Sequence, residues 1–509
     1  MLPVRPRSRT GVFLVARPDE SQRAIVVACA VLAFVARLAR AGGIPGLWAY
    51  GGYDDGVYFA AADAFVHGRV PYRDFLLLHP PGIVLALAPF AELTHWTPDA
   101  QALVMARVAW MVLGAVNTAL VVRVAGAGGR RSALTAGLLY ALLPVATGAE
   151  YLTMLEPLGT TAVLAAVLLA RRAERAGASG WWSFGSGAAV AMAPMTKIWG
   201  VVVVGVVLAW HAWRLGPRSA LRAASGAFAA ALVVMGPFAV LAGGKFWRDV
   251  VVDQLGRPRA PVSAAARLAG LTGTSTSALP GAAVVALAGV VSVALIGCSI
   301  ITWRARRGRL WVVLLGVQVA VLVLSPSYFT HYAALAAPSL VLVVASAVAS
   351  APRLSRASIA VAACAGLACA TVSALSPSAV PFPAQTVRAL LPTAGCVRSD
   401  SPGALVLLDL LSRELKSGCT VLVDLSGISY DRRGRSATGP VSRRSNRLYQ
   451  EEAVDYLASG SSAVLVRGLG DGFSGGTVQK ILAGRQLERV GGYVRVLTLP
   501  GGVLHDPAG

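Results

Sequence analysis

Apolar runs of about 15–24 residues recur along this 509-residue chain, and a helix that crosses a bilayer needs roughly 20. Charged residues make up only 14% of the chain. A soluble protein of this length would carry a more charged surface. The runs therefore predict a polytopic α-helical membrane protein with about 11 transmembrane helices. We expect these helices at residues 24–41, 103–122, 133–149, 157–171, 183–195, 199–213, 223–243, 280–303, 310–325, 334–350 and 358–376.

The arginines are distributed unevenly between successive connections. If the N-terminus is cytoplasmic, the cytoplasmic connections hold arginine clusters near residues 130, 172, 214, 306 and 353, whereas the opposite connections near residues 150 and 328 hold no basic residue. This is the positive-inside pattern, and it places the C-terminal tail outside the cell membrane. The net charge of +22 then reflects topology, and arginines scattered in this way argue against a nucleic-acid partner.

The first apolar run has a second interpretation as a cleaved signal peptide, because it follows a basic stretch. It ends in Arg37-Leu38-Ala39-Arg40 rather than in a small-residue cleavage site, so we expect an uncleaved span. The predicted organisation is a basic cytoplasmic N-terminus (residues 1–23), a membrane domain (24–376) and an extracytoplasmic tail (377–509).

Two long loops on the predicted exterior side interrupt the membrane domain, at residues 42–102 and 244–279. The first loop holds nearly all the exterior acids and has two short segments, residues 54–66 and 83–95, that we expect to lie in the membrane interface as helices. The second loop is basic, against the positive-inside trend, and contains Lys245, Arg248, Arg257, Arg259 and Arg267.

The tail has the pattern of a small α/β domain. Helices are predicted at residues 404–415 and 446–459, buried strands at 419–427 and 462–468, and a polar, arginine-rich loop at 431–446. Cys396 and Cys419 both fall in the tail, where a disulfide is permitted but not required. We expect the tail to orient an acceptor rather than to perform chemistry.

An acidic pair, Asp54-Asp55, directly follows the first span, and Tyr58 and the stiff turn His79-Pro80-Pro81-Gly82 come after it. A carboxylate at the membrane surface can act as a general base on a hydroxyl group when its neighbours keep it ionised and oriented. The alternative is a solvated acid pair in a loop.

The order of these motifs resembles that of the GT-C glycosyltransferases, which are polytopic enzymes that use polyprenyl-phosphate sugars. Protein O-mannosyltransferases, aminoarabinose transferases and glycosyltransferase family 87-like membrane proteins are among them. The resemblance covers roughly residues 20–350. It rests on the acidic pair with Tyr58, on His79-Pro80-Pro81, on Arg107 in the next span, on Glu156 after the following hairpin and on Lys197 between two short spans.

The resemblance implies that Asp54 is the base that takes the acceptor proton and that Tyr58 contacts substrate. Asp55 would be a helper, or would hold a divalent metal ion (Mg, Mn or Zn) together with Glu156. Arg107, His79 and Lys197 would bind the donor phosphate, where a preorganised cation stabilises the charge that develops as the phosphate leaves. From their positions at the exterior side, we add Arg257 and Arg259 as phosphate ligands and His331 and Tyr332 as substrate-binding residues.

Each of these assignments has a plainer alternative. His79 could stabilise its turn, Glu150 and Glu156 could be solvated acids at span ends, and Lys197 could extend to the interface. His331 and Tyr332 could be ordinary interfacial aromatic residues, and Arg257 and Arg259 could bind anionic lipid headgroups.

The function that the sequence favours is transfer of a sugar from a polyprenyl-phosphate donor to an extracytoplasmic acceptor, which would be a cell-wall glycan, a lipid or a protein. Membrane lipids would surround the enzyme, and the donor would enter from the bilayer. A transporter or lipid flippase is the main alternative, although that class favours ionisable residues at mid-membrane and matching halves. A non-catalytic envelope scaffold is the other, and it predicts that Asp54 and Asp55 are dispensable.

Overall fold

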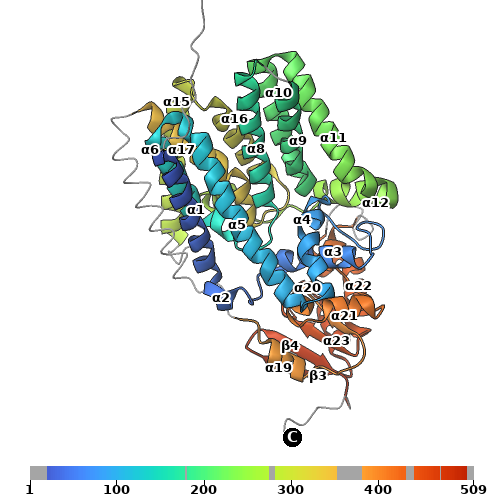
Figure 1. Cartoon of the computed structure of the whole chain (residues 1–509). Coiled ribbons are helices and arrows are strands. Elements are labelled where there is room, and N and C mark those ends of the chain that lie inside the picture. The colour runs from blue at the N-terminus through green and yellow to red at the C-terminus, as the bar shows by residue number, and fades with distance from the viewer. Residues whose placement is uncertain are drawn as a thin grey trace, which may run out of the picture.

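A bundle of long helices stands above a small, mostly antiparallel sheet in the computed structural model (Figure 1). The structure describes residues 20–177, 180–273, 281–351, 381–431, 441–469 and 472–500. In the first part of the chain the helices are α1 (Glu20–Ala41), α2 (Gly43–Gly46), α3 (Tyr53–Val66), α4 (Gly82–Ala91), η1 (Glu92–His95), α5 (Asp99–Ala125), η2 (Gly126–Gly128), α6 (Arg130–Leu142) and α7 (Pro144–Glu150).

The remaining helices of the bundle include both long and short elements. They are α8 (Glu156–Arg175), α9 (Gly180–Thr196), η3 (Ile198–Gly200), α10 (Val201–Leu215), α11 (Pro217–Ala242), α12 (Gly244–Trp247), η4 (Arg248–Val252), α13 (Asp253–Leu255), α14 (Ala264–Thr272), α15 (Gly281–Arg304), α16 (Arg309–Leu324), η6 (Thr330–Ala336) and α17 (Ala337–Ser350).

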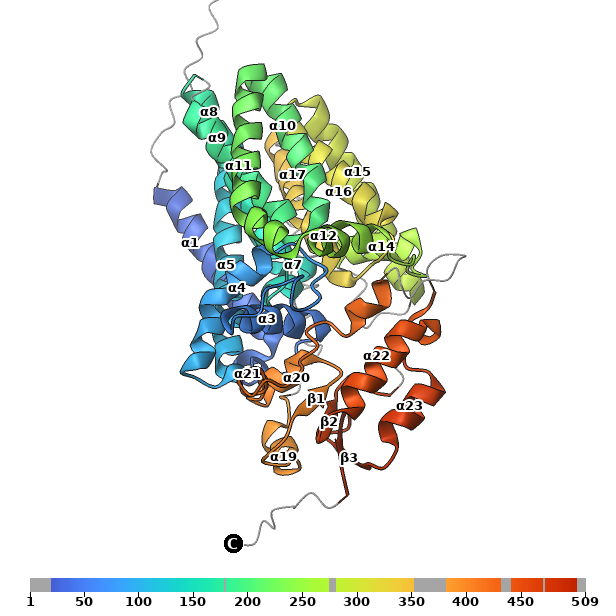
Figure 2. The ribbon, with the colours of Figure 1, turned by 90° about the vertical axis from the view of Figure 1, so that its right-hand side faces the viewer.

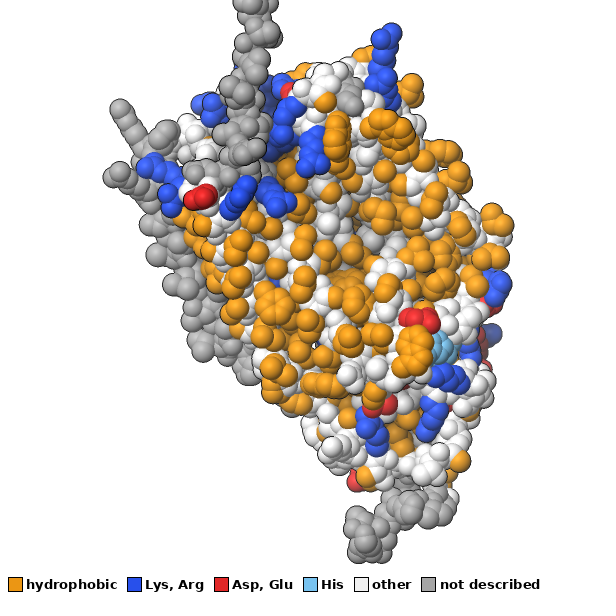
Figure 3. Space-filling model, in the orientation of Figure 1, with side chains coloured by type: hydrophobic (Ala, Val, Ile, Leu, Met, Phe, Trp, Pro, Cys, Tyr) orange, Lys and Arg blue, Asp and Glu red, His pale blue; other side chains and the backbone are white. Residues whose placement is uncertain are grey.

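Six helical segments of the described chain are long and apolar enough to cross a membrane: Glu20–Ala41, Asp99–Gly128, Ile198–Leu215, Pro217–Ala242, Gly281–Arg304 and Thr330–Ser350. Their outward surfaces are apolar, and Leu232, Val240 and Val293 are among the exposed large side chains. Figure 3 shows hydrophobic side chains over much of the visible face of the bundle, with basic side chains gathered above them. Lipid is the medium in which such a surface is stable, so the chain is a multi-pass membrane protein.

Each predicted run up to residue 350 corresponds to a helix or to a pair of helices. The run at 358–376 lies outside the described residues, so the number of 11 spans stays a prediction. The run at 133–149 is not one straight helix, because α6 and α7 meet at a bend of 58°. Pro144 causes this break, since proline lacks an amide proton and forces Leu143 into an extended conformation.

The two short helices predicted in the first loop are present as α3 and as α4 with η1. For α3 the prediction of an interfacial position is wrong, because every residue from Asp55 to Ala64 is buried. The sequence pattern could not show this, since the covering elements are α4 and the tail helix α20 (Pro402–Leu407), which lies far along the chain. Figure 2 shows α3 between the helix bundle and the tail.

The tail contributes a four-stranded sheet in the order β1-β2-β4-β3, with β1 and β2 parallel and the other pairs antiparallel. Its elements are α19 (Ala384–Ala389), β1 (Val397–Ser399), α20, α21 (Leu411–Lys416), η7 (Ser426–Tyr430), η9 (Arg443–Ser445), α22 (Arg447–Ala458), β2 (Ser462–Leu465), α23 (Gly475–Leu482), β3 (Gln486–Val490) and β4 (Val494–Thr498). The predicted helix at 446–459 and the predicted strand at 462–468 are present as α22 and β2. Cys396 and Cys419 form a disulfide.

Two tail predictions need correction. The segment 419–427 is not a strand, because Asp424 accepts a hydrogen bond from the Tyr53 hydroxyl and Gly427 N–H closes a turn on the same carboxylate, which draws the segment toward the bundle. The predicted helix at 404–415 is split at Asp409, whose φ of 55° ends α20. The predicted loop at 431–446 lies partly outside the described residues.

Two glycines bring α3 and α20 into backbone contact. A Cβ atom added at Gly56 would lie 2.6 Å from the Cα and N atoms of Gly403, which is closer than any real Cβ contact. The Gly56→Ala substitution is therefore expected to push α20 away from α3 and to loosen the tail, measured as faster trypsin cleavage of the tail in detergent. Gly205→Ala is the matched control, because no atom lies within 4 Å of the added Cβ. Equal cleavage of the two variants would contradict this contact.

Candidate active site

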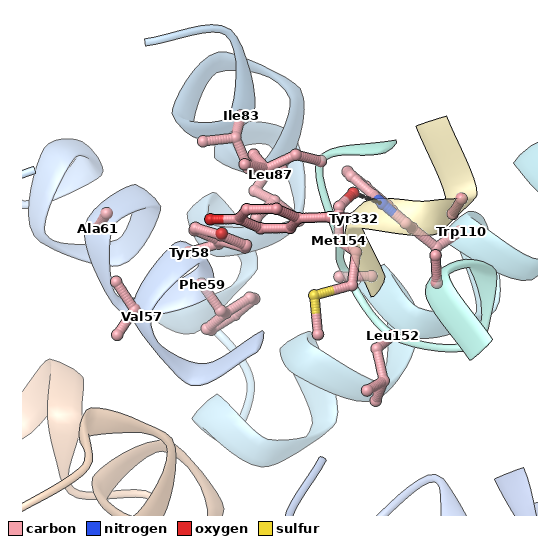
Figure 4. Packing of buried hydrophobic residues seen from close by; sticks show 14 of the residues in the cluster. Val57, Tyr58, Phe59, Ala61, Ile83, Leu87, Trp110, Leu152, Met154 and Tyr332 are labelled. Carbon is pink, nitrogen blue, oxygen red and sulfur yellow. Dashed lines mark hydrogen bonds between the residues drawn. The ribbon is translucent and has the colours of Figure 1, made fainter. Parts of the chain in front are cut away.

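A cavity of about 410 Å³ lies where the first loop, the ends of several helices and the tail meet. Six residues singled out from the sequence line it together: Asp54, Tyr58, His79, Arg257, His331 and Tyr332. Tyr58 of α3 and Tyr332 of η6 belong to one apolar cluster, which Figure 4 shows with Leu87, Met154 and Trp110 around them. The tail closes the cavity with Asp424, Ser426, Tyr430, Arg443 and Arg467.

Asp54 lies in the first turn of α3, with its side chain 31% exposed toward the cavity. Its Oδ2 atom is 3.6 Å from Nε2 of His331. The first turn of a helix favours a negative charge, because the helix dipole and the free amide groups point toward it. A carboxylate held in this way is available to a substrate hydroxyl that enters the cavity.

Asp55 points away from the cavity, because successive residues of a helix are turned by about 100°. Its Oδ2 atom accepts a 2.5 Å hydrogen bond from the Arg107 guanidinium, and its Oδ1 atom accepts bonds from the amide and hydroxyl groups of Thr153. Arg107 also donates to the carbonyls of Leu47 and Ala49. The structure therefore places Arg107 outside this cavity, where its buried guanidinium bonds to the start of α3 and to the segment before it.

Glu156 and Lys197 form a buried pair, with Lys197 Nζ 2.6 Å from Glu156 Oε1. Lys197 lies in the break between α9 and η3, and its Nζ atom is 3.3 Å from the centroid of the Tyr332 ring. The plainer alternatives are wrong for this pair, because Glu156 is not a solvated acid and Lys197 does not extend to the membrane surface. Glu150 is not solvated either, since it is buried against Arg37. The Glu156–Lys197 pair places a cation under the ring of Tyr332.

Arg257 and Arg259 differ sharply in position. Arg257 is 7% exposed, lines the cavity and lies over the ring of Tyr430, with its Cζ atom 4.4 Å from the ring centroid. Its buried Nε atom has no hydrogen-bond partner among the described residues. Arg259 is exposed and is not part of the cavity wall. Contact with the headgroups of surrounding lipids therefore fits the exposed Arg259 better than the buried Arg257.

His79 lies against Tyr58 with the two ring centroids 5.5 Å apart, and its backbone carbonyl accepts a hydrogen bond from the Tyr72 hydroxyl. Burial, together with the positive charges of Arg257 and Lys197, lowers the pKa of His79 well below its ordinary value. The imidazole is therefore neutral near pH 7. It can offer a phosphate a hydrogen bond but not a positive charge.

The tail wall of the cavity contains residues that sequence reasoning missed. Burial raises the pKa of Asp424, which accepts a 2.8 Å hydrogen bond from the Tyr53 hydroxyl. Arg467 stacks over the ring of Tyr53 at 4.1 Å and donates to the Ser426 hydroxyl. No local signal points to these side chains, because Asp424 and Arg467 both fall within predicted strands. Their contribution arises from contacts that span more than 370 positions along the chain, such as Tyr53 with Ser426.

The residues proposed as metal ligands do not fit a divalent cation. Asp55 is neutralised by Arg107 and Glu156 by Lys197, so a metal ion would have to displace a buried guanidinium and a buried ammonium group. Within the described residues, one set of three candidate ligand atoms lies close together, that of Cys396, Glu414 and Cys419. Its two sulfur atoms are joined in the disulfide and are not thiolate ligands.

No protein-family model and no curated protein sequence matches this chain. Its structure is similar to that of ArnT from Cupriavidus metallidurans bound to undecaprenyl phosphate, with a TM-score of 0.60 and 16% identity over 93% of this chain and 97% of the other. The apo state of that protein gives a TM-score of 0.58. The chain has the GT-C fold. The oligosaccharyltransferase from Archaeoglobus fulgidus, in a complex with Zn and sulfate, has a TM-score of 0.54 and 12% identity over 93% of this chain and 73% of the other.

The fold brings together residues that lie far apart along the chain. Asp54 and His331 are separated in sequence by most of the bundle, yet η6 brings His331 to the first turn of α3. The structural similarity covers 93% of this chain, so it includes the tail. The sequence motifs, in contrast, all lie before the tail.

Proposed function

We propose that this protein is a membrane glycosyltransferase that moves a sugar from a polyprenyl-phosphate donor to an extracytoplasmic acceptor. The proposal rests on the cavity, whose wall contains both a carboxylate and a guanidinium. The Asp54 carboxylate is accessible, and the Arg257 guanidinium is buried, with an Nε atom that has no hydrogen-bond partner among the described residues. The bound undecaprenyl phosphate in ArnT, which shares the fold, supports a lipid phosphate as the donor.

In the proposed reaction, Asp54 accepts the proton of an acceptor hydroxyl while the acceptor oxygen attacks the anomeric carbon of the donor. The bond between that carbon and the phosphate oxygen breaks, and the electron pair leaves with the lipid phosphate. Arg257 stabilises the charge that develops on this phosphate, and neutral His79 donates a hydrogen bond to it. The products are the glycosylated acceptor, the lipid phosphate and a protonated Asp54.

Buried pairs position this machinery. The Asp55–Arg107 pair fixes the start of α3 and so the direction of Asp54. The ammonium group of the Glu156–Lys197 pair packs against the face of the Tyr332 ring and holds it in place, so that the rings of Tyr332 and Tyr58 form one wall of the sugar site. We propose that the tail, predicted to lie outside the membrane as residues 377–509, supplies the acceptor side of the cavity through Asp424 and Arg467.

The test is a transfer assay in proteoliposomes that contain the full-length protein and radiolabelled polyprenyl-phosphate sugars of several kinds. Arg257→Gln is expected to lower turnover of the accepted donor by about 10²–10³, because it removes a preorganised charge from the leaving phosphate. Arg259→Gln is the matched control, since this arginine lies two positions away but is exposed. It is expected to keep turnover within about twofold, as for other surface changes.

Several outcomes would contradict the proposal. Equal losses for Arg257→Gln and Arg259→Gln would show that the buried guanidinium has no special role. Passage of intact lipid across the bilayer without cleavage of the sugar–phosphate bond would indicate a flippase instead. Absence of any transfer or donor hydrolysis with all donors tested would favour the scaffold interpretation.

A further inference from the structure

The end of the helix bundle opposite the candidate active site contains a second, strongly basic cavity. Helix α8 begins at Glu156 near the active site and, at 20 residues, is about 30 Å long. Near its far end two hollows of about 340 and 430 Å³ adjoin, since both are lined by Arg171, Arg214 and Trp311. We call these two hollows the arginine pocket; its wall also includes Arg306, Arg307 and Arg309.

The charge of the arginine pocket is of one sign. None of the residues that line its two hollows is an aspartate or a glutamate. The guanidinium of Arg214 is 2.6 Å from the carboxylate of Glu174, which does not line either hollow. Arg171 donates one N–H to the carbonyl of Val124, and Arg309 donates its Nε–H to the carbonyl of Trp303. A guanidinium has five N–H donors, so these bonds orient the two side chains and leave donors for a ligand.

Topology alone explains why arginines are abundant at this end, because positive residues favour the cytoplasmic side. It does not explain why they surround a hollow. The pocket is lined by the ends of several helices, among them α5, α8, α10, α16 and α17, and Trp311 in its wall is only 2% exposed. Basic pockets between transmembrane helices on the cytoplasmic side bind the headgroups of anionic lipids.

We propose that the arginine pocket binds the phosphate-bearing headgroup of an anionic membrane lipid. The phosphate would lie among the guanidinium groups, and the acyl chains would lie against the apolar flanks of the neighbouring helices. Trp213, which is 65% exposed beside the pocket, and Trp303, which is 46% exposed, lie where aromatic side chains meet the interfacial region of a bilayer. A lipid, unlike a free anion, satisfies both the charged wall and its apolar surroundings.

The test is native mass spectrometry of the full-length protein in detergent, with equal amounts of phosphatidylglycerol or phosphatidylcholine added. The wild type is expected to retain phosphatidylglycerol, and the Arg171→Gln/Arg307→Gln variant is expected to retain about tenfold less. The matched control is Arg218→Gln/Arg304→Gln, which removes two exposed arginines that line neither hollow. A thermal melt of each variant establishes that it is folded.

Three results would overturn the proposal. One is equal retention of the two lipids by the wild type, and another is an equal loss for the pocket and control variants, which would indicate diffuse attraction by the whole basic end. The third is displacement of phosphatidylglycerol by excess inorganic phosphate, because a site for a free anion would not need the lipid. Retention that survives inorganic phosphate supports the lipid site.

Discussion

Replacement of Asp54 by asparagine is expected to reduce sugar transfer by about 10²–10⁴, which is the contribution of a general base. Asparagine keeps the shape of the side chain and its place in the first turn of α3, but its amide cannot accept the proton of an acceptor hydroxyl. Donor binding is expected to change little, because the phosphate contacts come from other residues. The measurement is single-turnover transfer in proteoliposomes, with donor binding measured separately.

Asp74→Asn is the control for this experiment. Asp74 belongs to the same loop but is exposed and paired with Arg73, so its loss should leave transfer within about twofold of the wild type. Asp55→Asn should instead lower the thermal stability, since it leaves the buried Arg107 guanidinium without its carboxylate. An Asp54→Asn variant with more than half of the wild-type turnover would show that Asp54 is not the base.

The second large effect concerns a buried ion pair that holds the bundle together. Arg37 of α1 and Glu150 of α7 pair with side-chain exposures of 0% and 1%, and Glu150 also accepts hydrogen bonds from Tyr140 and Asn117. Arg37→Leu is expected to lower the free energy of unfolding by about 3–5 kcal/mol, because it leaves a buried carboxylate uncompensated. The measurement is thermal or denaturant-induced unfolding in detergent.

The double variant Arg37→Leu/Glu150→Leu should recover much of this loss, since it removes both charges from the interior. Arg123→Leu is the matched control, because Arg123 is exposed on α5 and should change the free energy of unfolding by less than about 0.5 kcal/mol. If Arg37→Leu were as mild as Arg123→Leu, the pair would not stabilise the bundle.

The sequence by itself was enough to determine the class of the protein and to locate its apolar helices as far as residue 350. The length of an apolar run and the number of arginines that flank it are local properties, so they can be read from each segment without knowing which other segments it contacts. The acidic pair, Tyr58 and the His79-Pro80-Pro81 turn are likewise close in sequence, so their meeting in one loop could be predicted.

Tertiary structure alone decided which of these residues face the cavity. Asp54 and Asp55 are adjacent and chemically alike, yet one is accessible and the other is clamped by Arg107, because the helical turn between them sends the two carboxylates to different neighbours. In the same way, Arg257 is buried over Tyr430 while Arg259 is exposed.

The contribution of the tail to the cavity could not be predicted from the sequence either. The backbone contact of Gly56 with Gly403 brings the tail onto α3, and it places Asp424 and Arg467 beside Tyr53. A partner of opposite sign stabilises a buried charge, but the chain offers many arginines and several acids, and hydrophobic periodicity does not specify which of them meet. Those pairs form only when helices distant in the sequence pack together, so the electrostatics of the site is a property of the fold.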